Sequence, residues 1–339
     1  MANRWPALVV LLACSSPALS QVVDNPTKKG DKIEFIGLKR WKADDLLQKY
    51  WEKNPGKSIH ACATCFKEQF GFGDAAVMQY VARDNKGLYT VITLIEPEDA
   101  KRVSYRMQIP EAESMPLPEW KEGLGFATSQ ILQPLVQTFP LILAGKEEEA
   151  RKLLPRFGVK SDKSEPAWDF LRKHNTRKDH DLAMWVLDHD GDAKHRMLAC
   201  AVLLNFGDED STWWRLADAQ RDRNAMVNSI AQTALASLAR NRPRAVDWRP
   251  ALPSLRAVLR GTNLFAYSGT LNVLKATKIT SELARDLLAD ADDLLIAYLR
   301  AEHEPSRRSA VEFLNQLSGL EFQTAEQWQE WLTKLQKKG

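Results

Sequence analysis

The sequence has little cysteine, almost no net charge and no long apolar run. Four cysteines in 339 residues are too few for a disulfide-held scaffold. The chain has 47 basic and 44 acidic residues, a formal net charge of +3, so electrostatics gives no case for nucleic-acid binding. No stretch reaches the roughly 20 apolar residues that span a bilayer, so we predict no membrane span. The remaining composition is that of a globular protein.

Several short motifs that mark enzymes and cofactor sites are also missing. The sequence contains no G-x-S-x-G elbow, Walker loop, H-E-x-x-H motif or dinucleotide-binding glycine fingerprint. These absences lower the expectation of an enzyme without excluding one. We therefore predict a non-catalytic protein with no cofactor and no metal.

Residues 1–20 have the pattern of a secretory signal peptide. One basic residue precedes an apolar run at 7–13, and small residues end in Ala18-Leu19-Ser20. Cleavage after Ser20 predicts a periplasmic or secreted protein. Leu11-Leu12-Ala13-Cys14 supports a second interpretation, because it resembles the lipobox of a lipoprotein signal with Cys14 as the lipidated residue. The protein would then be anchored to a membrane by lipid.

Residues 32–107 have the pattern of a small α/β domain. They follow a polar segment at 21–31, which we expect to be a tether. Hydrophobic periodicity predicts the order strand, helix, helix, strand, strand. The expected strands lie at 33–36, 75–82 and 88–95, and the expected helices at 43–53 and 58–70. In the last strand, alternate residues from Tyr89 to Ile95 share one face.

This domain resembles a POTRA domain. The resemblance rests on Ile36-Gly37-Leu38, Pro55-Gly56, Gly71-Phe72 and Thr93-Leu94-Ile95-Glu96-Pro97. POTRA domains are periplasmic modules that bind other chains, often by adding a strand at a sheet edge, so the resemblance implies a protein partner in the cell envelope. A generic small α/β domain is the alternative. POTRA domains usually precede a β-barrel, whereas this chain continues into helices, which puts barrel assembly in doubt.

Residues 121–339 are helical almost throughout and follow a proline-containing linker at 108–120. Four of the expected helices share a pattern in which one residue, here called the anchor, precedes a leucine on the same face. These anchors recur at intervals of roughly 30 to 45 residues, the period of helix-pair repeats. The anchors are Ala199, Ala231, Tyr267 and Ala310. These pairs resemble HEAT-type repeats, which implies an α-solenoid with a concave surface for protein partners. The predicted fold class is therefore mainly α, a HEAT-like solenoid preceded by a small α/β domain of order β-α-α-β-β.

Tryptophan and arginine residues are the candidate contacts of this scaffold. Both residue types are favoured at protein interfaces, so we predict that some of them bind the partner, although a core role for tryptophan and a solvated arginine loop are the alternatives. The residues are Trp213, Trp214, Trp248, Arg240, Arg242 and Arg244.

Cys62-Ala63-Thr64-Cys65 is the sharpest local motif. A disulfide or a packed pair is the favoured interpretation. Thiol-redox or metal-dependent activity at Cys62 and Cys65 is the alternative, because a helix start stabilises a thiolate. Four histidines between 174 and 195 and an acidic turn at 188–192 are better explained as polar helix ends than as a metal site.

Overall fold

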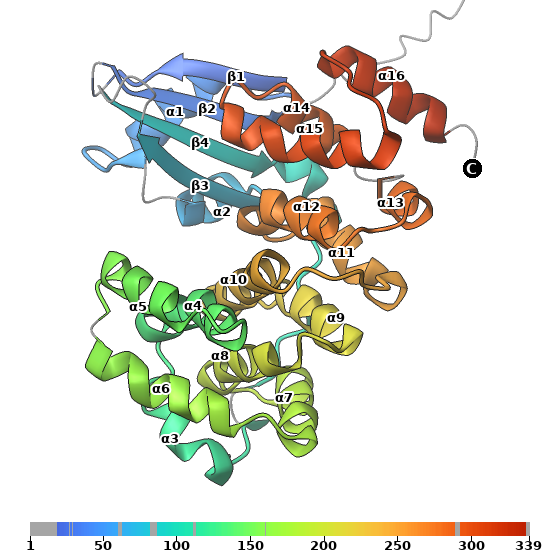
Figure 1. Ribbon diagram of the computed structural model, residues 1–339. Helices are drawn as coiled ribbons and strands as arrows, with labels where there is room; N and C mark the ends of the chain where they lie inside the picture. The colour runs from blue at the N-terminus through green and yellow to red at the C-terminus, as the bar shows by residue number, and fades with distance from the viewer. Residues whose placement is uncertain are drawn as a thin grey trace, which may run out of the picture.

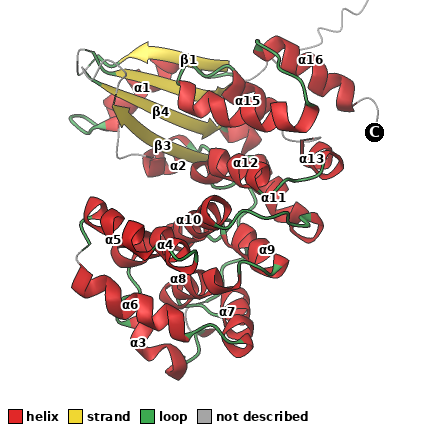
Figure 2. Ribbon diagram, in the orientation of Figure 1, coloured by secondary structure: helices red, strands yellow, loops and turns green. Residues whose placement is uncertain are grey.

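The computed structural model describes residues 19–336, apart from 27, 29, 60–62, 82–86, 111–112, 160 and 289–291. Cys14 and Cys62 therefore lie outside the described residues. The described chain is mainly helical, with one small sheet formed by its N-terminal part (Figures 1 and 2). This arrangement confirms the predicted class, mainly α with a small α/β part.

In the described part of the chain, four strands form the sheet in the order β1-β2-β4-β3. β2 and β4 are parallel, and the outer pairs are antiparallel. Two helices, α1 and α2, connect β2 to β3, which is the predicted order. The elements are β1 (Leu19–Asp24), β2 (Lys32–Leu38), α1 (Ala43–Lys53), α2 (Ala63–Phe70), β3 (Asp74–Val81) and β4 (Leu88–Ile95).

β1 lies in the segment that we expected to be a tether, and that expectation is wrong for residues 21–24. Val22 and Val23 favour a strand, and pairing with β2 satisfies the backbone groups of both strands. Ser20 Oγ also donates to the buried carboxylate of Glu34. The predicted cleavage bond after Ser20 therefore lies inside β1.

Both faces of the central strands are buried. Ile33, Phe35 and Ile92 point to the side that α1 and α2 cover. Ile36 and Val91 alternate with them and belong to the same core cluster as the helical residues that follow. The expected linker therefore does not separate two packing units, because one face of the sheet belongs to the same hydrophobic core as the helical region.

The helical region stacks its helices in two layers. α8, α10, α12 and α15 pack against one another in succession, and α7, α9, α11 and α13 form the second layer. The four anchor residues of the sequence lie on the first of these layers and are buried. The bounds are α7 (Arg177–His189), α8 (Ala193–Val202), α9 (Asp210–Ala219), α10 (Ala225–Asn241), α11 (Leu252–Leu259), α12 (Tyr267–Ala276), α13 (Ser281–Leu288) and α15 (Glu304–Ser318).

Helices at both ends of the region depart from the simple repeat. α4 packs across α8 and α10, so the chain itself covers part of that layer. α14 packs on β1 and β2, and its Tyr298 Oη lies 3.2 Å from Thr93 Oγ1 of β4. The bounds are α3 (Lys121–Leu124), α4 (Ser129–Leu143), α5 (Glu147–Leu153), α6 (Ser161–Lys173), α14 (Asp292–Leu299) and α16 (Ala325–Gln336).

An extended segment joins the sheet to the start of the helical region. We call residues 103–110 and 113–117 the strap; they follow the 3-10 helix η2 (Pro97–Arg102). In Figure 1 the chain runs from β4 along the stack of helices to α3. Ser104 N–H donates to Thr262 Oγ1 at 2.8 Å, and Arg106 N–H donates to the carbonyl of Arg221 at 2.8 Å. The strap thereby binds the turns of successive helix pairs.

A network of ion pairs fixes the sheet end of the strap. Arg102 makes a bidentate contact with Asp293, at 2.5 and 2.7 Å, and Lys39 Nζ lies 2.6 Å from the same carboxylate. Burial alone would raise the pKa of Asp293, but Arg102 and Lys39 outweigh it and hold that pKa well below its usual range. β2, η2 and α14 are thus joined through one side chain.

We expect Asp293→Asn to lower the free energy of unfolding by about 3 kcal/mol at pH 7, because it leaves the partly buried Arg102 without its counter-ion. Lys39 would lose one of its two carboxylates and keep Asp99, at 2.7 Å. The pKa of Asp293 is depressed in the folded state, so its contribution is present above the unfolded pKa of about 4 and is lost as the pH falls below it. The difference in free energy of unfolding between the wild-type and Asp293→Asn proteins, measured in urea, should therefore be smaller at pH 3 than at pH 7.

Asp286→Asn is the matched control, since Asp286 is exposed and lies 3.8 Å from its partner Arg256. We expect this change to cost less than about 0.5 kcal/mol. Equal costs for the two substitutions would contradict the structural role of Asp293.

Candidate functional site

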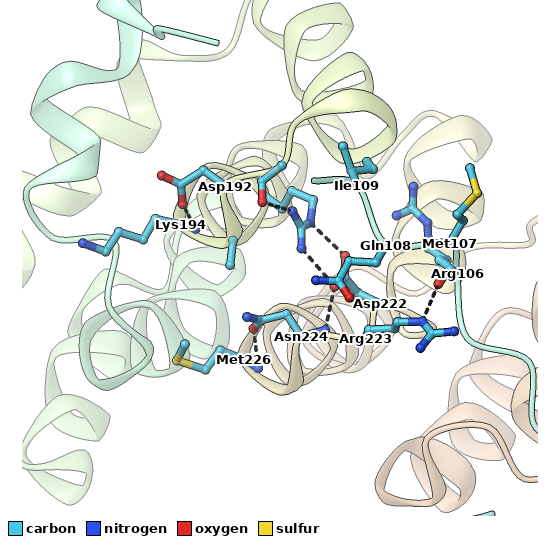
Figure 3. Close-up of a pocket in the computed structure, with 13 residues that line it drawn as sticks. Arg106, Met107, Gln108, Ile109, Asp192, Lys194, Asp222, Arg223, Asn224 and Met226 are labelled. Atoms are coloured by element: carbon cyan, nitrogen blue, oxygen red, sulfur yellow. Dashed lines mark hydrogen bonds and ion pairs between the residues drawn. The ribbon is translucent and has the colours of Figure 1, made fainter. Parts of the chain in front are cut away.

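The strap and two helix N-termini enclose a pocket of about 490 Å³. Arg106 to Ile109 of the strap form one side, and the first residues of α8 and α10 form the other (Figure 3). We call it the strap pocket. Its lining residues are Arg106, Met107, Gln108, Ile109, Gly191, Asp192, Ala193, Lys194, Arg196, Asp222, Arg223, Asn224 and Met226.

Two turns of the same design bring these helices to the pocket. Asp190 Oδ1 accepts the N–H of Asp192 at 2.8 Å, and Asp222 Oδ1 accepts the N–H of Asn224 at 2.9 Å. Asp192 and Asn224 then cap α8 and α10 by accepting N–H groups of their first turns. Both helices consequently direct their positive dipole ends toward the strap pocket.

A buried ion pair closes the inner wall of the pocket. Arg196 Nε and Nη2 donate to the carboxylate of Asp222 at 2.9 and 3.1 Å, and Arg196 Nη1 donates to the carbonyls of Asp190 and Gly191. Both side chains are almost fully buried. The negative charge of Asp222 is balanced by that of Arg196, so this pair leaves the charge of the pocket's outer residues unchanged.

Arg106 anchors the strap at the same place. Its guanidinium lies 3.3 Å from Asp188 and 3.2 Å from Asp218, and it donates to the carbonyl of Leu187 at 2.6 Å. Arg223 Nε donates to the carbonyl of Arg106 at 3.3 Å. These contacts connect the strap to α7, α9 and the α9–α10 turn, and they hold residues 107–109 over the helix N-termini.

Two cations of the pocket have no carboxylate partner. Lys194 and Arg223 are exposed, and neither forms an ion pair within the described residues. Two helix dipoles add positive potential at the same point. Four basic and two acidic side chains line the strap pocket, so it carries an excess of positive charge although Asp192 lies at the start of α8.

Ser114, Asp190 and His195 meet beside the strap pocket, and their geometry is not that of a nucleophilic triad. Ser114 Oγ lies 3.0 Å from Asp190 Oδ1 and 3.3 Å from His195 Nδ1, while Asp190 Oδ2 lies 2.9 Å from the same Nδ1. A triad needs serine and carboxylate on opposite ring nitrogens. Here all three groups tie the strap to the α7–α8 turn.

The structure places the predicted tryptophan contacts mostly in the core. Trp213 and Trp248 are fully buried and stack edge to face at 6.3 Å, so the prediction that they bind a partner at the surface is wrong. Their indole N–H groups donate inside the fold, to the carbonyl of Gly207 and to Thr277 Oγ1. Trp214 is partly buried and donates to the carbonyl of Asp247 at 2.6 Å.

The predicted arginine contacts do not share one surface role. Arg242 lies 2.6 Å from Asp208, and Arg244 lies 2.5 Å from Asp210. These ion pairs brace the segment between α10 and α11 against the residues around the start of α9. Arg240 is exposed at the end of α10.

The cysteines offer no reactive thiol in the described part of the chain. Cys65 is disulfide-bonded, and Cys62 lies outside the described residues, so their pairing stays a prediction. Cys200 is a free thiol on α8, and burial raises its pKa to about 12. Within the same residues, no group of three His, Cys, Asp or Glu side chains could hold a metal ion.

Sequence reasoning did not identify the strap pocket. A usable signal exists, because Asp190-Gly191-Asp192 and Asp222-Arg223-Asn224 repeat the same Asp-x-Asp/Asn turn before α8 and α10. Nothing in the sequence indicates that residues 106–109 lie across both turns.

Comparison with known proteins gives this chain no relative. No protein-family model, no curated protein and no solved structure matches it. In addition, none of the helices within the described residues has both the length and the apolar character needed to cross a membrane.

We expect Cys200 to resist iodoacetamide in the native protein between pH 7 and pH 9, because the buried thiol stays protonated and inaccessible. Mass spectrometry of the peptide that contains Cys200 should show no alkylation of Cys200 without denaturant and complete alkylation in urea. Modification of Cys200 at similar rates in both conditions would contradict its burial.

Proposed function

We propose that the protein is a non-catalytic interaction module of the cell envelope, and that the strap pocket binds an extended protein segment bearing carboxylates and apolar side chains. The two unpaired cations at the two helix N-termini carry this proposal. We also propose that the helical region is a HEAT-like repeat array, because other proteins use such two-layer stacks of helix pairs as binding scaffolds.

The charge of the strap pocket selects an anionic partner. Lys194 and Arg223 can each pair with a carboxylate, and the positive dipole ends of α8 and α10 favour negative charge. The buried Arg196–Asp222 pair keeps the wall rigid, so a ligand would find this potential already in place.

Two methionines add an adaptable apolar contact. Met107 is 89% exposed on the strap and Met226 is 45% exposed at the start of α10. Methionine is flexible and polarizable, and it is common at binding surfaces. An extended segment with alternating acidic and apolar side chains would contact both the two cations and the two methionines of the pocket.

The covered layer explains why we prefer this pocket to the face of the helical stack. α4 packs across α8 and α10, and residues from α14 and the start of α15 meet the sheet. The broad concave face that a HEAT-like array implies is therefore partly filled by the chain itself. The strap pocket lies at the helix ends, where the strap and the turns are accessible.

Photocrosslinking tests the pocket in cells that express the full-length chain. We expect a photoreactive phenylalanine at position 226 to capture a protein partner, and the double change Lys194→Glu with Arg223→Glu to reduce capture about tenfold by repelling its carboxylates. Gel mobility and mass spectrometry of the crosslinked product give the readout.

Two controls accompany this experiment. The probe at Phe157, which is exposed on the 3-10 helix after α5, reports general surface crosslinking. The double change Lys152→Glu with Arg285→Glu alters the net charge equally at exposed positions away from the pocket. Identical products from positions 226 and 157, or capture that persists undiminished after the pocket charge reversal, would refute the proposed site.

The position of β1 favours the lipoprotein signal over the signal peptide that is cleaved after Ser20. Cleavage after Ser20 would remove Leu19 and Ser20 from β1, and with them the hydroxyl that donates to Glu34. Processing before Cys14 would leave the whole strand and this hydrogen bond in the mature protein. We therefore propose that the chain is exported and anchored by lipid at Cys14.

We expect the mature protein to begin at Cys14 and to incorporate labelled palmitate, because this form retains β1. Mass spectrometry of the purified N-terminus and metabolic labelling provide the measurement, with Cys14→Ala as the unlabelled control. A mature N-terminus at Gln21 would contradict the lipid anchor and favour the released form.

A further inference from the structure

A second depression lies beside α1, on the opposite face of the sheet from α14. It has a volume of about 560 Å³ and is lined by the end of β1 and by one side of α1. We call it the α1 groove. Its residues are Asp24, Pro26, Asp44, Leu47, Gln48, Trp51 and Glu52.

The α1 groove carries charge of one sign. Asp24, Asp44 and Glu52 contribute three carboxylates, and no lining residue is cationic. All three side chains are exposed, and none forms an ion pair within the described residues; Glu52 accepts a hydrogen bond from Gln48 at 2.9 Å. The residues that line the groove therefore carry net negative charge, and Glu52 also borders the neighbouring depression that Lys49 and Lys53 line.

The aromatic rings of this surface show which group would suit the groove. Lys49 Nζ lies 4.8 Å from the ring centroid of Trp41, and Lys53 Nζ lies 4.6 Å from that of Phe70. These two rings bind cations of the chain itself. Trp51 lines the α1 groove, and among the described residues no cation is stacked on its ring.

We propose that the α1 groove binds a lysine or arginine side chain of an extended segment from a partner protein. Trp51 would contribute a cation–π contact, and Asp44 and Glu52 would pair with the charge. Leu47 is almost fully buried and would contact the aliphatic part of the same side chain. Carboxylates alone would suit any cation, whereas this combination suits a basic side chain with an apolar stem.

This groove is independent of the strap pocket. The two sites lie on different parts of the chain and have opposite charge. A protein with both could hold two segments of opposite charge, which is the property of an adaptor.

Fluorescence polarization with two defined peptides tests the groove on the full-length protein. Both are capped, fluorescein-labelled nonapeptides, one alternating arginine with leucine and the other alternating glutamate with leucine. We expect the arginine peptide to bind, and the double change Asp44→Asn with Glu52→Gln to weaken its binding about tenfold. Trp51→Leu should weaken it independently of these charges.

Glu148→Gln with Glu149→Gln is the matched control, because it removes two exposed carboxylates from the first turn of another helix, α5. This control should leave the affinity for the arginine peptide unchanged, and none of the α1 variants should alter binding of the glutamate peptide. Absence of arginine-peptide binding, or equal effects of the groove and control variants, would overturn the proposal without affecting the strap pocket.

Discussion

The contact of the strap with the turns of successive helix pairs determines the rest of the structure. The strap leaves the sheet at Arg102, whose guanidinium is held by Asp293, and its backbone then binds Thr262 and Arg221. Because these contacts span the stack, the sheet and the helices cannot separate without breaking them. The last helices return to the sheet, where α14 packs on β1 and β2, and one face of the sheet joins the helical core.

The strap pocket is a consequence of this path. Arg106 pairs with carboxylates on α7 and α9, and its position sets Met107, Gln108 and Ile109 over the N-termini of α8 and α10. Asp222 pairs with Arg196 and Asp190 with His195, and of the lining carboxylates this leaves Asp192 beside the outward-facing Lys194 and Arg223, so positive charge is in excess. A nearly neutral chain thereby gains one locally cationic pocket and, at α1, one acidic groove.

Local sequence patterns predicted the local structure well. The order of elements from β2 to β4, the bounds of α1 and the burial of Ala199, Ala231, Tyr267 and Ala310 all follow from hydrophobic periodicity. Long-range packing did not follow, because periodicity cannot tell that Thr93 of β4 meets Tyr298 of α14, 205 residues away. Trp213 and Trp248 show the same limit, because the sequence does not distinguish a buried tryptophan from one at an interface.

Hydrogen exchange of the strap backbone tests the central claim most directly. The N–H groups of Ser104 and Arg106 donate within the fold, so a fixed strap requires that they exchange only through large-scale unfolding. Exchange measured by mass spectrometry on peptides covering 103–109 should be nearly as slow as in β4. Exchange at the rate of an unstructured loop would show that the strap is loose, and the pocket that it forms would not exist in the free protein.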